Sequence, residues 1–231
     1  MIKAIFFDFN GVIIDDETIQ MKAFQEVLRG HEINVTEEWY FDSLGMDDRT
    51  FVRSMFGRAG KPLTDPVLEK VIDEKTLRHR DTIKDQLPFF PGVLTFLKST
   101  SRHFSIGLVS MANINEVGYV FERGNLTPLF SVIVTAEDTS VCKPAPDCYV
   151  CGLAKLNERR QRERLLPLLA SECLAIEDSP PGIESARGAG MRTFGVTNTV
   201  EEAALRAAGA EVVTGSLADW TVDAVRLVYD K

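Results

Sequence analysis

The sequence is poor in cysteine and histidine. Its four cysteines, Cys142, Cys148, Cys151 and Cys173, all lie in the second half, and a chain of 231 residues does not depend on disulfides for stability. Cys148 and Cys151 have C-x-x-C spacing, but the three histidines are scattered and no second pair completes a zinc site. We therefore expect reduced thiols that act as small apolar side chains, Cys148 and Cys151 on a helix.

The sequence also lacks an excess of basic residues. Its net charge of -8 and pI near 5.0 argue against nonspecific binding to nucleic acid or to an anionic membrane, because both need a basic surface. No stretch is apolar enough for a membrane span, and the first residues enter a strand without a basic flank or a cleavage site. We expect a cytoplasmic monomer with no nucleic-acid or membrane partner.

The first apolar run, residues 5–14, predicts a buried strand that ends in a turn. The run carries Asp8 and is interrupted by Asn10-Gly11. Strand ends are where α/β proteins place their reactive groups. Asp8 and Asn10 could also serve only the turn, because Asp, Asn and Gly tolerate its backbone angles.

Residues 17–86 show helical periodicity and no convincing strand. Apolar residues at helical spacing predict four faces: Met21, Phe24, Val27 and Leu28; Trp39, Phe41 and Leu44; Phe51, Val52, Met55 and Phe56; and Val67, Leu68, Val71, Ile72 and Leu77. We expect an all-α cap inserted after the first strand, with residues 1–16 and 87–231 forming the α/β core.

From residue 88 onward, predicted strands and helices alternate, which is the pattern of a parallel sheet. The predicted strands are 104–110, 131–135, 174–177, 193–196 and 211–214, and the predicted helices are 93–101, 114–123, 147–156, 183–189 and 201–208. The charged run 158–164 predicts a solvated helix or loop. The fold class is therefore α/β, a Rossmann-like parallel sheet core with an inserted all-α cap domain.

Four predicted strand ends carry polar residues of complementary chemistry. These residues are Asp8 on the first strand, Ser110 at the end of the second, Lys143 after the third, and Glu177 and Asp178 at the end of the fourth. Each has an ordinary explanation as a cap, a surface charge or a turn residue. The carboxyl ends of parallel strands meet at one edge, however, so these groups should converge. A carboxylate nucleophile, a hydroxyl, a lysine and two acids are what phosphoryl transfer needs.

These stretches resemble the four motifs of the haloacid dehalogenase (HAD) superfamily, most closely its beta-phosphoglucomutase-like and sugar-phosphatase branch. The motif residues are Asp8-Phe9-Asn10-Gly11-Val12-Ile13, Ser110, Lys143-Pro144-Ala145-Pro146-Asp147, and Glu177-Asp178-Ser179 with Gly182-Ile183 and Ala189-Gly190-Met191. The resemblance covers essentially the whole chain, including the cap between the first two motifs. It implies an HAD-like fold and a magnesium-dependent phosphatase of small phosphorylated metabolites such as sugar phosphates.

The resemblance also implies a role for each motif residue. Asp8 would be the nucleophile that forms an aspartyl-phosphate. Ser110, Asn113, Lys143 and Gly11 would contact the phosphoryl group or substrate, and Arg49 would contact substrate from the cap unless it is an ordinary exposed arginine. Mg²⁺ would bind Asp8, the backbone carbonyl of Asn10, Glu177 and Asp178. Dehalogenation needs no metal, so the two acids favour phosphate chemistry.

Asn10 departs from the family pattern. Phosphate-processing members have an aspartate here that protonates the leaving oxygen and later activates water, whereas an amide cannot shuttle a proton. Such a loss typically costs about 10² to 10⁴ in rate. Four explanations are open: a change made to trap a complex, a surrogate acid among Asp15, Asp16 and Glu17, a binding protein without turnover, or deamidation of Asn10-Gly11 to an aspartate.

Two other functions fit the same motifs. A beta-phosphoglucomutase-like sugar phosphomutase would use the Asp8 chemistry but return the phosphoryl group to another hydroxyl. A phosphate-ligand-binding or regulatory protein would keep the site without turnover. In every case the cap is expected to open and close about hinges near residues 14–17 and 86–91, because the site must admit substrate and then exclude water.

Overall fold

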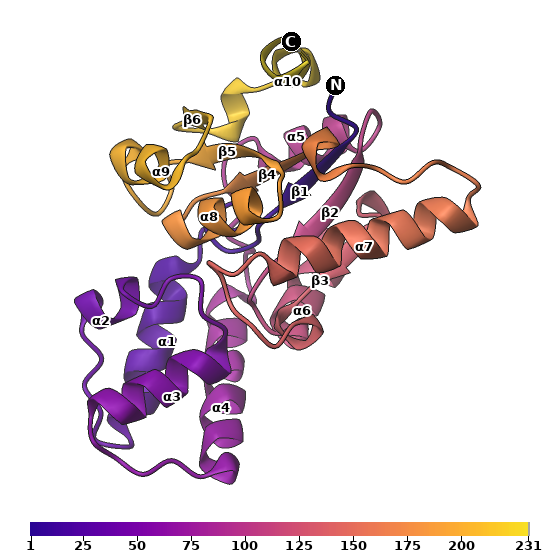
Figure 1. The fold of residues 1–231 in the computed structure, drawn as a ribbon. Coiled ribbons are helices and arrows are strands. Elements are labelled where there is room, and N and C mark those ends of the chain that lie inside the picture. Colours follow the sequence, from indigo (N-terminus) through magenta and orange to yellow (C-terminus); the bar gives the residue numbers. More distant parts are fainter. Residues whose placement is uncertain (231) are drawn as a thin grey trace.

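The centre of the molecule is a six-stranded parallel sheet (Figure 1). A computed structural model describes residues 1–230. The strands are β1 (Ala4–Phe7), β2 (Ser105–Val109), β3 (Val132–Val134), β4 (Cys173–Glu177), β5 (Arg192–Val196) and β6 (Val212–Thr214). Their order in the sheet is β3-β2-β1-β4-β5-β6. The predicted α/β fold with a parallel sheet is confirmed.

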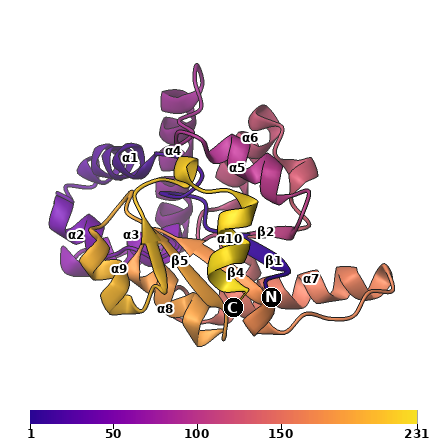
Figure 2. The ribbon, with the colours of Figure 1, turned by 90° about the horizontal axis from the view of Figure 1, so that it is seen from above.

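Helices cover both faces of this sheet (Figure 2). The helices of the core are α5 (Val93–Thr100), α6 (Ile114–Gly124), α7 (Asp147–Arg162), α8 (Pro180–Gly188), α9 (Glu202–Ala208) and α10 (Val222–Tyr229). Ile5 and Phe7 of β1 pack with α5, α6 and α10, while Ala4 and Phe6 pack with α7 and α8. Successive residues of a strand point to opposite faces, so both faces of β1 are buried, which explains its unbroken apolar sequence.

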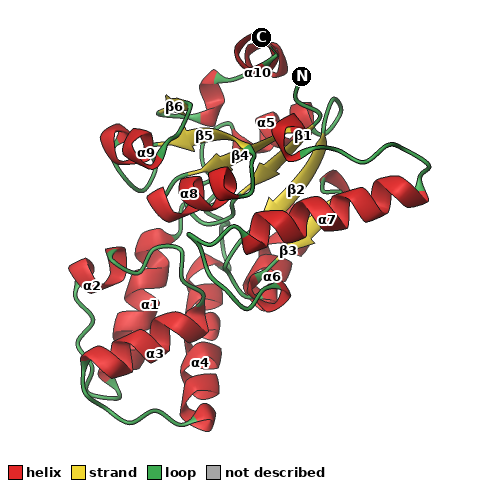
Figure 3. Cartoon of the chain, in the orientation of Figure 1, coloured by secondary structure: helices red, strands yellow, loops and turns green. Residues whose placement is uncertain are grey.

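Between β1 and β2 the chain forms a separate group of helices beside the carboxyl edge of the sheet (Figure 3). These are α1 (Glu17–Arg29), α2 (Glu37–Phe41), α3 (Asp48–Arg58) and α4 (Asp65–Ile83). Residues from Met21 to Val71 form an apolar cluster of their own. The helical insertion is therefore confirmed, and we call α1 to α4 the cap. The exact division of the chain at residues 17 and 86 stays a prediction.

Two of the apolar faces expected in the cap are wrong in part. In α2 the buried side chain is Tyr40, whereas Phe41 is 43% exposed. This helix has five residues, too few for periodicity to identify its buried side. In α4, Leu77 is 61% exposed, and the buried stripe continues from Val71 through two polar residues, Lys75 and His79, at helical spacing.

The remaining differences are one helix that was not expected and shifted element ends. Helix α10 had no counterpart in the expected elements, and α8 begins at Pro180 rather than at residue 183 because Ser179 accepts a hydrogen bond from the Gly182 backbone. Helix α7 includes most of the charged run, as expected. All four cysteines are free, and Cys148 packs in the core. Within residues 1–230 no helix has the length and apolarity to span a membrane.

Candidate active site

Asp8 stands just past the end of β1, the central strand of the sheet. Strand β1 has β2 on one side and β4 on the other, so its carboxyl end opens at the point where the strand order reverses. Open α/β sheets bind ligands in such crevices. The Asp8 side chain is 12% exposed and lines a pocket between the sheet edge and the cap.

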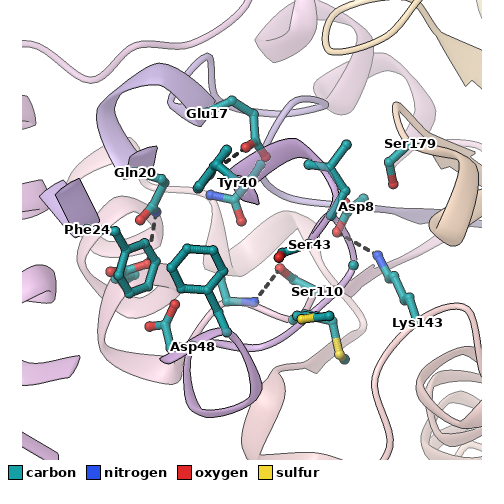
Figure 4. Close-up of a pocket in the computed structure, with 18 of the residues that line it drawn as sticks. Asp8, Glu17, Gln20, Phe24, Tyr40, Ser43, Asp48, Ser110, Lys143 and Ser179 are labelled. Carbon is teal, nitrogen blue, oxygen red and sulfur yellow. Dashed lines mark hydrogen bonds and ion pairs between the residues drawn. The ribbon is translucent and has the colours of Figure 1, made fainter. Parts of the chain in front are cut away.

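Lys143 brings a buried positive charge to Asp8. Its Nζ lies 3.0 Å from Asp8 Oδ1 and 2.7 Å from Glu177 Oε1 (Figure 4 shows the contact with Asp8). Burial alone lowers the pKa of Lys143, but the charges of Asp8 and Glu177 outweigh it and raise that pKa above its usual value. Lys143 is therefore a permanent cation between two carboxylates.

Three buried carboxylates form a group that could hold a metal ion. Asp8, Glu177 and Asp178 each offer an oxygen, and these oxygens all lie within 4.8 Å of one another; no other such group occurs among residues 1–230. Burial, followed by the charge of Asp8, raises the pKa of both Glu177 and Asp178. Three carboxylates this close repel one another, and a divalent cation would relieve that repulsion.

The surroundings of these acids fit an oxygen-bound cation. In the described part of the chain Glu177 Oε2 is buried and has no hydrogen-bond partner. Gly182 leaves room for it, since a Cβ there would lie 1.9 Å from that oxygen. Gly11, with φ +70°, leaves room for Asp178, since a Cβ there would lie 1.8 Å from Asp178 Oδ2. Hard cations such as Mg²⁺ prefer such carboxylate oxygens, so the residues present suit a divalent metal.

Ser110 and Asn113 lie on the loop between β2 and α6. Ser110 lines the pocket, and its Oγ accepts a hydrogen bond from the Ala112 backbone at 3.0 Å. Its hydroxyl hydrogen is therefore free to donate to a ligand. Asn113 caps α6 by accepting from the Glu116 backbone, and its amide donates to Asp48 of the cap at 2.9 Å. Asn113 supports the loop but does not line the pocket.

The cap supplies the far wall of the pocket. The side chains that line it from this side include Glu17, Gln20, Phe24, Tyr40, Ser43, Asp48, Phe51 and Lys75. Figure 4 shows Tyr40 beside Glu17, and its hydroxyl donates to Glu17 Oε2 at 2.7 Å. The pocket is therefore bounded by charged groups on the sheet side and by mixed polar and aromatic groups on the cap side.

A buried ionic network joins the cap to the core beside this pocket. Lys75 Nζ lies 2.9 Å from Asp48 Oδ1 and 2.8 Å from Glu116 Oε1 on α6. Burial lowers the pKa of Lys75, but these two carboxylates outweigh it and raise the pKa above its usual value. Gln20 donates to Glu116 at 3.0 Å. The charge of Lys75 is thus neutralised within the protein.

The Asn10 side chain points to the start of the cap. Its Nδ2 lies 2.9 Å from both carboxylate oxygens of Asp16, which is fully buried. Asp16 also accepts from Gln20 at 3.1 Å and contacts His79 Nε2 at 2.7 Å. Burial lowers the pKa of His79, but the hydrogen bond to Asp16 and the charges of Glu116 and Asp16 together outweigh it and raise the pKa above its usual value. Asn10 is therefore a hydrogen-bond donor to the buried carboxyl group of Asp16, the residue that precedes α1.

Arg49 lies outside the pocket. Its guanidinium pairs with Glu69 of α4, and both side chains are about half exposed. The cap cation that lines the pocket is Lys75. The sequence did not suggest it as a site residue, nor did it suggest four other lining residues, Gln20, Tyr40, Asp48 and Glu116. The usable signal was the α4 stripe, in which Lys75 follows Val71 by four residues. A charged residue on a buried stripe needs a buried partner.

Comparisons with known proteins agree with this geometry. The family model described as Haloacid dehalogenase-like hydrolase matches residues 5–196. YhcW of Bacillus subtilis is 30% identical over 205 residues, which are 87% of this chain and 86% of YhcW. The phosphorylated carbohydrates phosphatase of Thermotoga maritima is 26% identical over 214 residues, 90% of this chain and 92% of that protein.

Among solved structures, the crystal structure of beta-phosphoglucomutase from Clostridium difficile superposes with a TM-score of 0.84 at 21% identity. It covers all of this chain and 98% of the other. At that identity the likeness shows the fold, including a helical cap on a parallel sheet. The family match covers most of the chain and all four motif regions. This chain therefore belongs to the haloacid dehalogenase-like hydrolases.

Proposed function

We propose that this hydrolase is a Mg²⁺-dependent phosphatase that removes the phosphoryl group from small phosphorylated metabolites such as sugar phosphates. The observation that carries the proposal is the meeting of Asp8, Lys143, Glu177 and Asp178 at one sheet edge. Phosphoryl transfer depends on positioning and on charge neutralisation. A nucleophilic carboxylate, a fixed cation and two further acids that could bind a metal ion meet these needs.

Asp8 carries the covalent step in this proposal. One of its oxygens attacks phosphorus, the bond from phosphorus to the leaving oxygen breaks, and the phosphoryl group remains on Asp8. Water then attacks the phosphorus atom of this acyl phosphate, which releases inorganic phosphate and restores the carboxylate. The pocket position of Asp8 supports this role, because it faces the cap, from which the substrate would extend.

Lys143 and Ser110 would hold the phosphoryl oxygens. The Lys143 ammonium is already 3.0 Å from the attacking group, and the free hydroxyl hydrogen of Ser110 lines the same pocket. Charge-assisted hydrogen bonds of this kind are strong in a buried site. Gly11 would contribute indirectly, because its missing side chain leaves the space that the Asp178 carboxylate occupies. Asn113 would keep the Ser110 loop in place through its contacts with Asp48 and Glu116.

Asp8, the backbone carbonyl of Asn10, Glu177 and Asp178 would hold the Mg²⁺ ion. A bound Mg²⁺ supplies positive charge that offsets the charge of the phosphoryl oxygens. Asn10 keeps its backbone carbonyl, so the amide side chain does not remove a ligand. The amide does remove a proton carrier from the position where family members have an aspartate, and we propose that turnover is slower than with an aspartate there.

A polyol leaving group suits the cap side of the pocket. Gln20 is buried, lines the pocket, and uses its amide nitrogen on Asp16 and Glu116, while among residues 1–230 its Oε1 has no partner. A sugar hydroxyl could donate to that oxygen and satisfy it. The T. maritima relative is named for its action on phosphorylated carbohydrates, which supports the same substrate class.

A phosphatase panel tests this proposal. Phosphate release is measured with Mg²⁺ on hexose, pentose and hexitol monophosphates, phosphoglycolate and a nucleoside monophosphate, for the unchanged chain and for Asp8→Asn. We expect Asp8-dependent release that is greatest on the sugar and sugar-alcohol phosphates. Release that is equal in both proteins, or none from any monoester, contradicts the proposal. A parallel assay for sugar 1-phosphate converted to 6-phosphate detects mutase activity.

A further inference from the structure

We propose that Glu17 takes over the proton transfers that Asn10 cannot perform. In this inference, which rests on the phosphatase function proposed above, Glu17 is a catalytic residue of the site. It protonates the leaving oxygen and afterwards accepts a proton from the attacking water. The chain thus keeps general acid and base catalysis with the acid moved from the turn after β1 to the first residue of α1.

Asp15 and Asp16, the other two acids near the expected hinge at residues 14–17, are unsuitable for this proton transfer. Asp16 is fully buried, does not line the pocket, and both its oxygens are taken by Asn10, Gln20 and His79. Asp15 is exposed and lies outside the pocket lining. Neither carboxylate can reach a leaving oxygen in the pocket. Glu17 is the hinge acid that lines the pocket together with Asp8.

Glu17 has an oxygen available for a ligand. Its Oε2 accepts from the Tyr40 hydroxyl at 2.7 Å, and among residues 1–230 this carboxyl accepts no other hydrogen bond. Figure 4 shows Glu17 beside Tyr40, and both line the same pocket as Asp8. Tyr40 thus fixes the orientation of the carboxyl while leaving Oε1 free. A positioned acid of this kind is what proton transfer to a leaving group needs.

The charges around Glu17 keep both of its protonation states accessible near neutral pH. Burial, followed by the charges of Asp16 and Asp8, outweighs the opposite effects of Tyr40 and Lys75 and raises the pKa of Glu17 to about 7. Glu17 in turn helps to raise the pKa of Asp178. A general acid that must also act as a base works best with a pKa near the operating pH.

The two proton transfers balance. In the first step Asp8 forms its bond to phosphorus, the bond from phosphorus to the leaving oxygen breaks, and the Glu17 carboxyl gives its proton to that oxygen to form an alcohol. In the second step water attacks phosphorus, Glu17 carboxylate takes one proton from the water, and the bond from phosphorus to Asp8 breaks. Phosphate leaves, and both residues return to their starting states.

Glu17→Gln tests the inference through two leaving groups, a sugar phosphate that needs an acid and p-nitrophenyl phosphate that does not. We expect turnover of the sugar phosphate to fall by about 10²-fold or more. On p-nitrophenyl phosphate we expect a burst of about one nitrophenol per protein followed by slow turnover, because the phospho-enzyme forms but lacks a base for its hydrolysis. A structural role would slow both substrates without a burst.

Two further variants complete the test. Asn10→Asp introduced into Glu17→Gln should restore sugar-phosphate turnover, because it returns an acid to the usual position, whereas Asp15→Asn should leave turnover within about twofold. The inference is overturned if Glu17→Gln retains sugar-phosphate turnover, if it slows both substrates without a burst, or if Asn10→Asp fails to rescue it. If Asp8→Asn releases phosphate as fast as the unchanged chain, the phosphatase proposal itself has failed.

Discussion

The Asn10 side-chain amide lies 2.9 Å from both carboxylate oxygens of Asp16, and it is held there. The following backbone amide, Gly11 N, donates to Ile14 O at 2.9 Å. Deamidation of an Asn-Gly pair requires that this backbone nitrogen be free to attack the asparagine side chain. In the folded chain both groups are engaged in hydrogen bonds with other residues, so the fold protects the amide.

We expect Asn10 to remain an amide in the folded protein. Peptide mass spectrometry on native protein incubated at pH 8 should show intact asparagine, while the same incubation in urea should convert it faster. A freshly purified folded sample in which much of Asn10 is already aspartate would contradict this.

Asp16 should be important for stability. It is fully buried and accepts from Asn10, Gln20 and His79. Asp16→Asn removes the charge that partners His79, and loss of one member of a buried pair costs about 3–5 kcal/mol. Urea unfolding followed by circular dichroism measures the change. Asp15→Asn, one residue away and exposed, serves as the control and should stay within about 0.5 kcal/mol. Equal unfolding midpoints for the two variants would rule out this role.

Asn10→Asp should raise turnover of sugar phosphates by about tenfold. The new carboxyl would face Asp16, and two carboxylates that share a site push one pKa upward, which keeps the new acid protonated as a donor. The gain stays below the full 10² to 10⁴ of acid–base catalysis because Glu17 supplies part of it. Turnover of p-nitrophenyl phosphate should change less. An increase in turnover of the same size on both substrates would contradict the explanation that Asn10→Asp restores an acid.

Glu17 should make the metal-free protein less stable as the pH rises. Its pKa is about 7 in the folded chain against 4.5 ordinarily, so the folded state binds more protons than the unfolded state between these values. By linkage, stability falls as the pH rises through this window. Glu17→Gln should therefore gain stability relative to the unchanged protein at pH 8 but not at pH 4. Thermal unfolding with EDTA at both values measures this, and a pH-independent difference would contradict it.

Mg²⁺ should raise the unfolding temperature through the acidic cluster, and more at pH 8 than at pH 6. Burial and Asp8 raise the pKa of Glu177 and Asp178, so at lower pH protons compete with the metal for the same oxygens. Thermal shift with Mg²⁺ is compared with KCl at equal ionic strength. The Asp178→Asn variant should lose the Mg²⁺-specific shift, and an undiminished shift there would place the metal elsewhere.

The sequence predicted the sheet and its strand-end residues because those signals are local. Asp8, Ser110 and Glu177 each end an apolar run of a buried strand, and parallel strands bring such ends to one edge without any knowledge of packing. The structure also explains the glycines at positions 11 and 182, since a side chain at Gly11 or Gly182 would occupy the space of an acidic side chain.

The cap side of the site was not predictable in the same way. Lys75 meets Glu116 across 41 residues and Asn113 meets Asp48 across 65, and no local pattern couples residues so far apart. Arg49, which the family resemblance suggested for substrate contact, pairs with Glu69 at the surface. The short helix α2 showed no usable period, so Tyr40 and its contact with Glu17 emerged only from the folded arrangement.

In the proposed reaction Asp8 carries the phosphoryl group. The most direct test is mass spectrometry of protein quenched in acid during turnover of a sugar phosphate with Mg²⁺, followed by digestion. We expect the phosphoryl group on the peptide that contains Asp8, and more of it in Glu17→Gln because water attack is slower there. Phosphate release with the phosphoryl group on another residue, or undiminished release by Asp8→Asn, would contradict this role of Asp8.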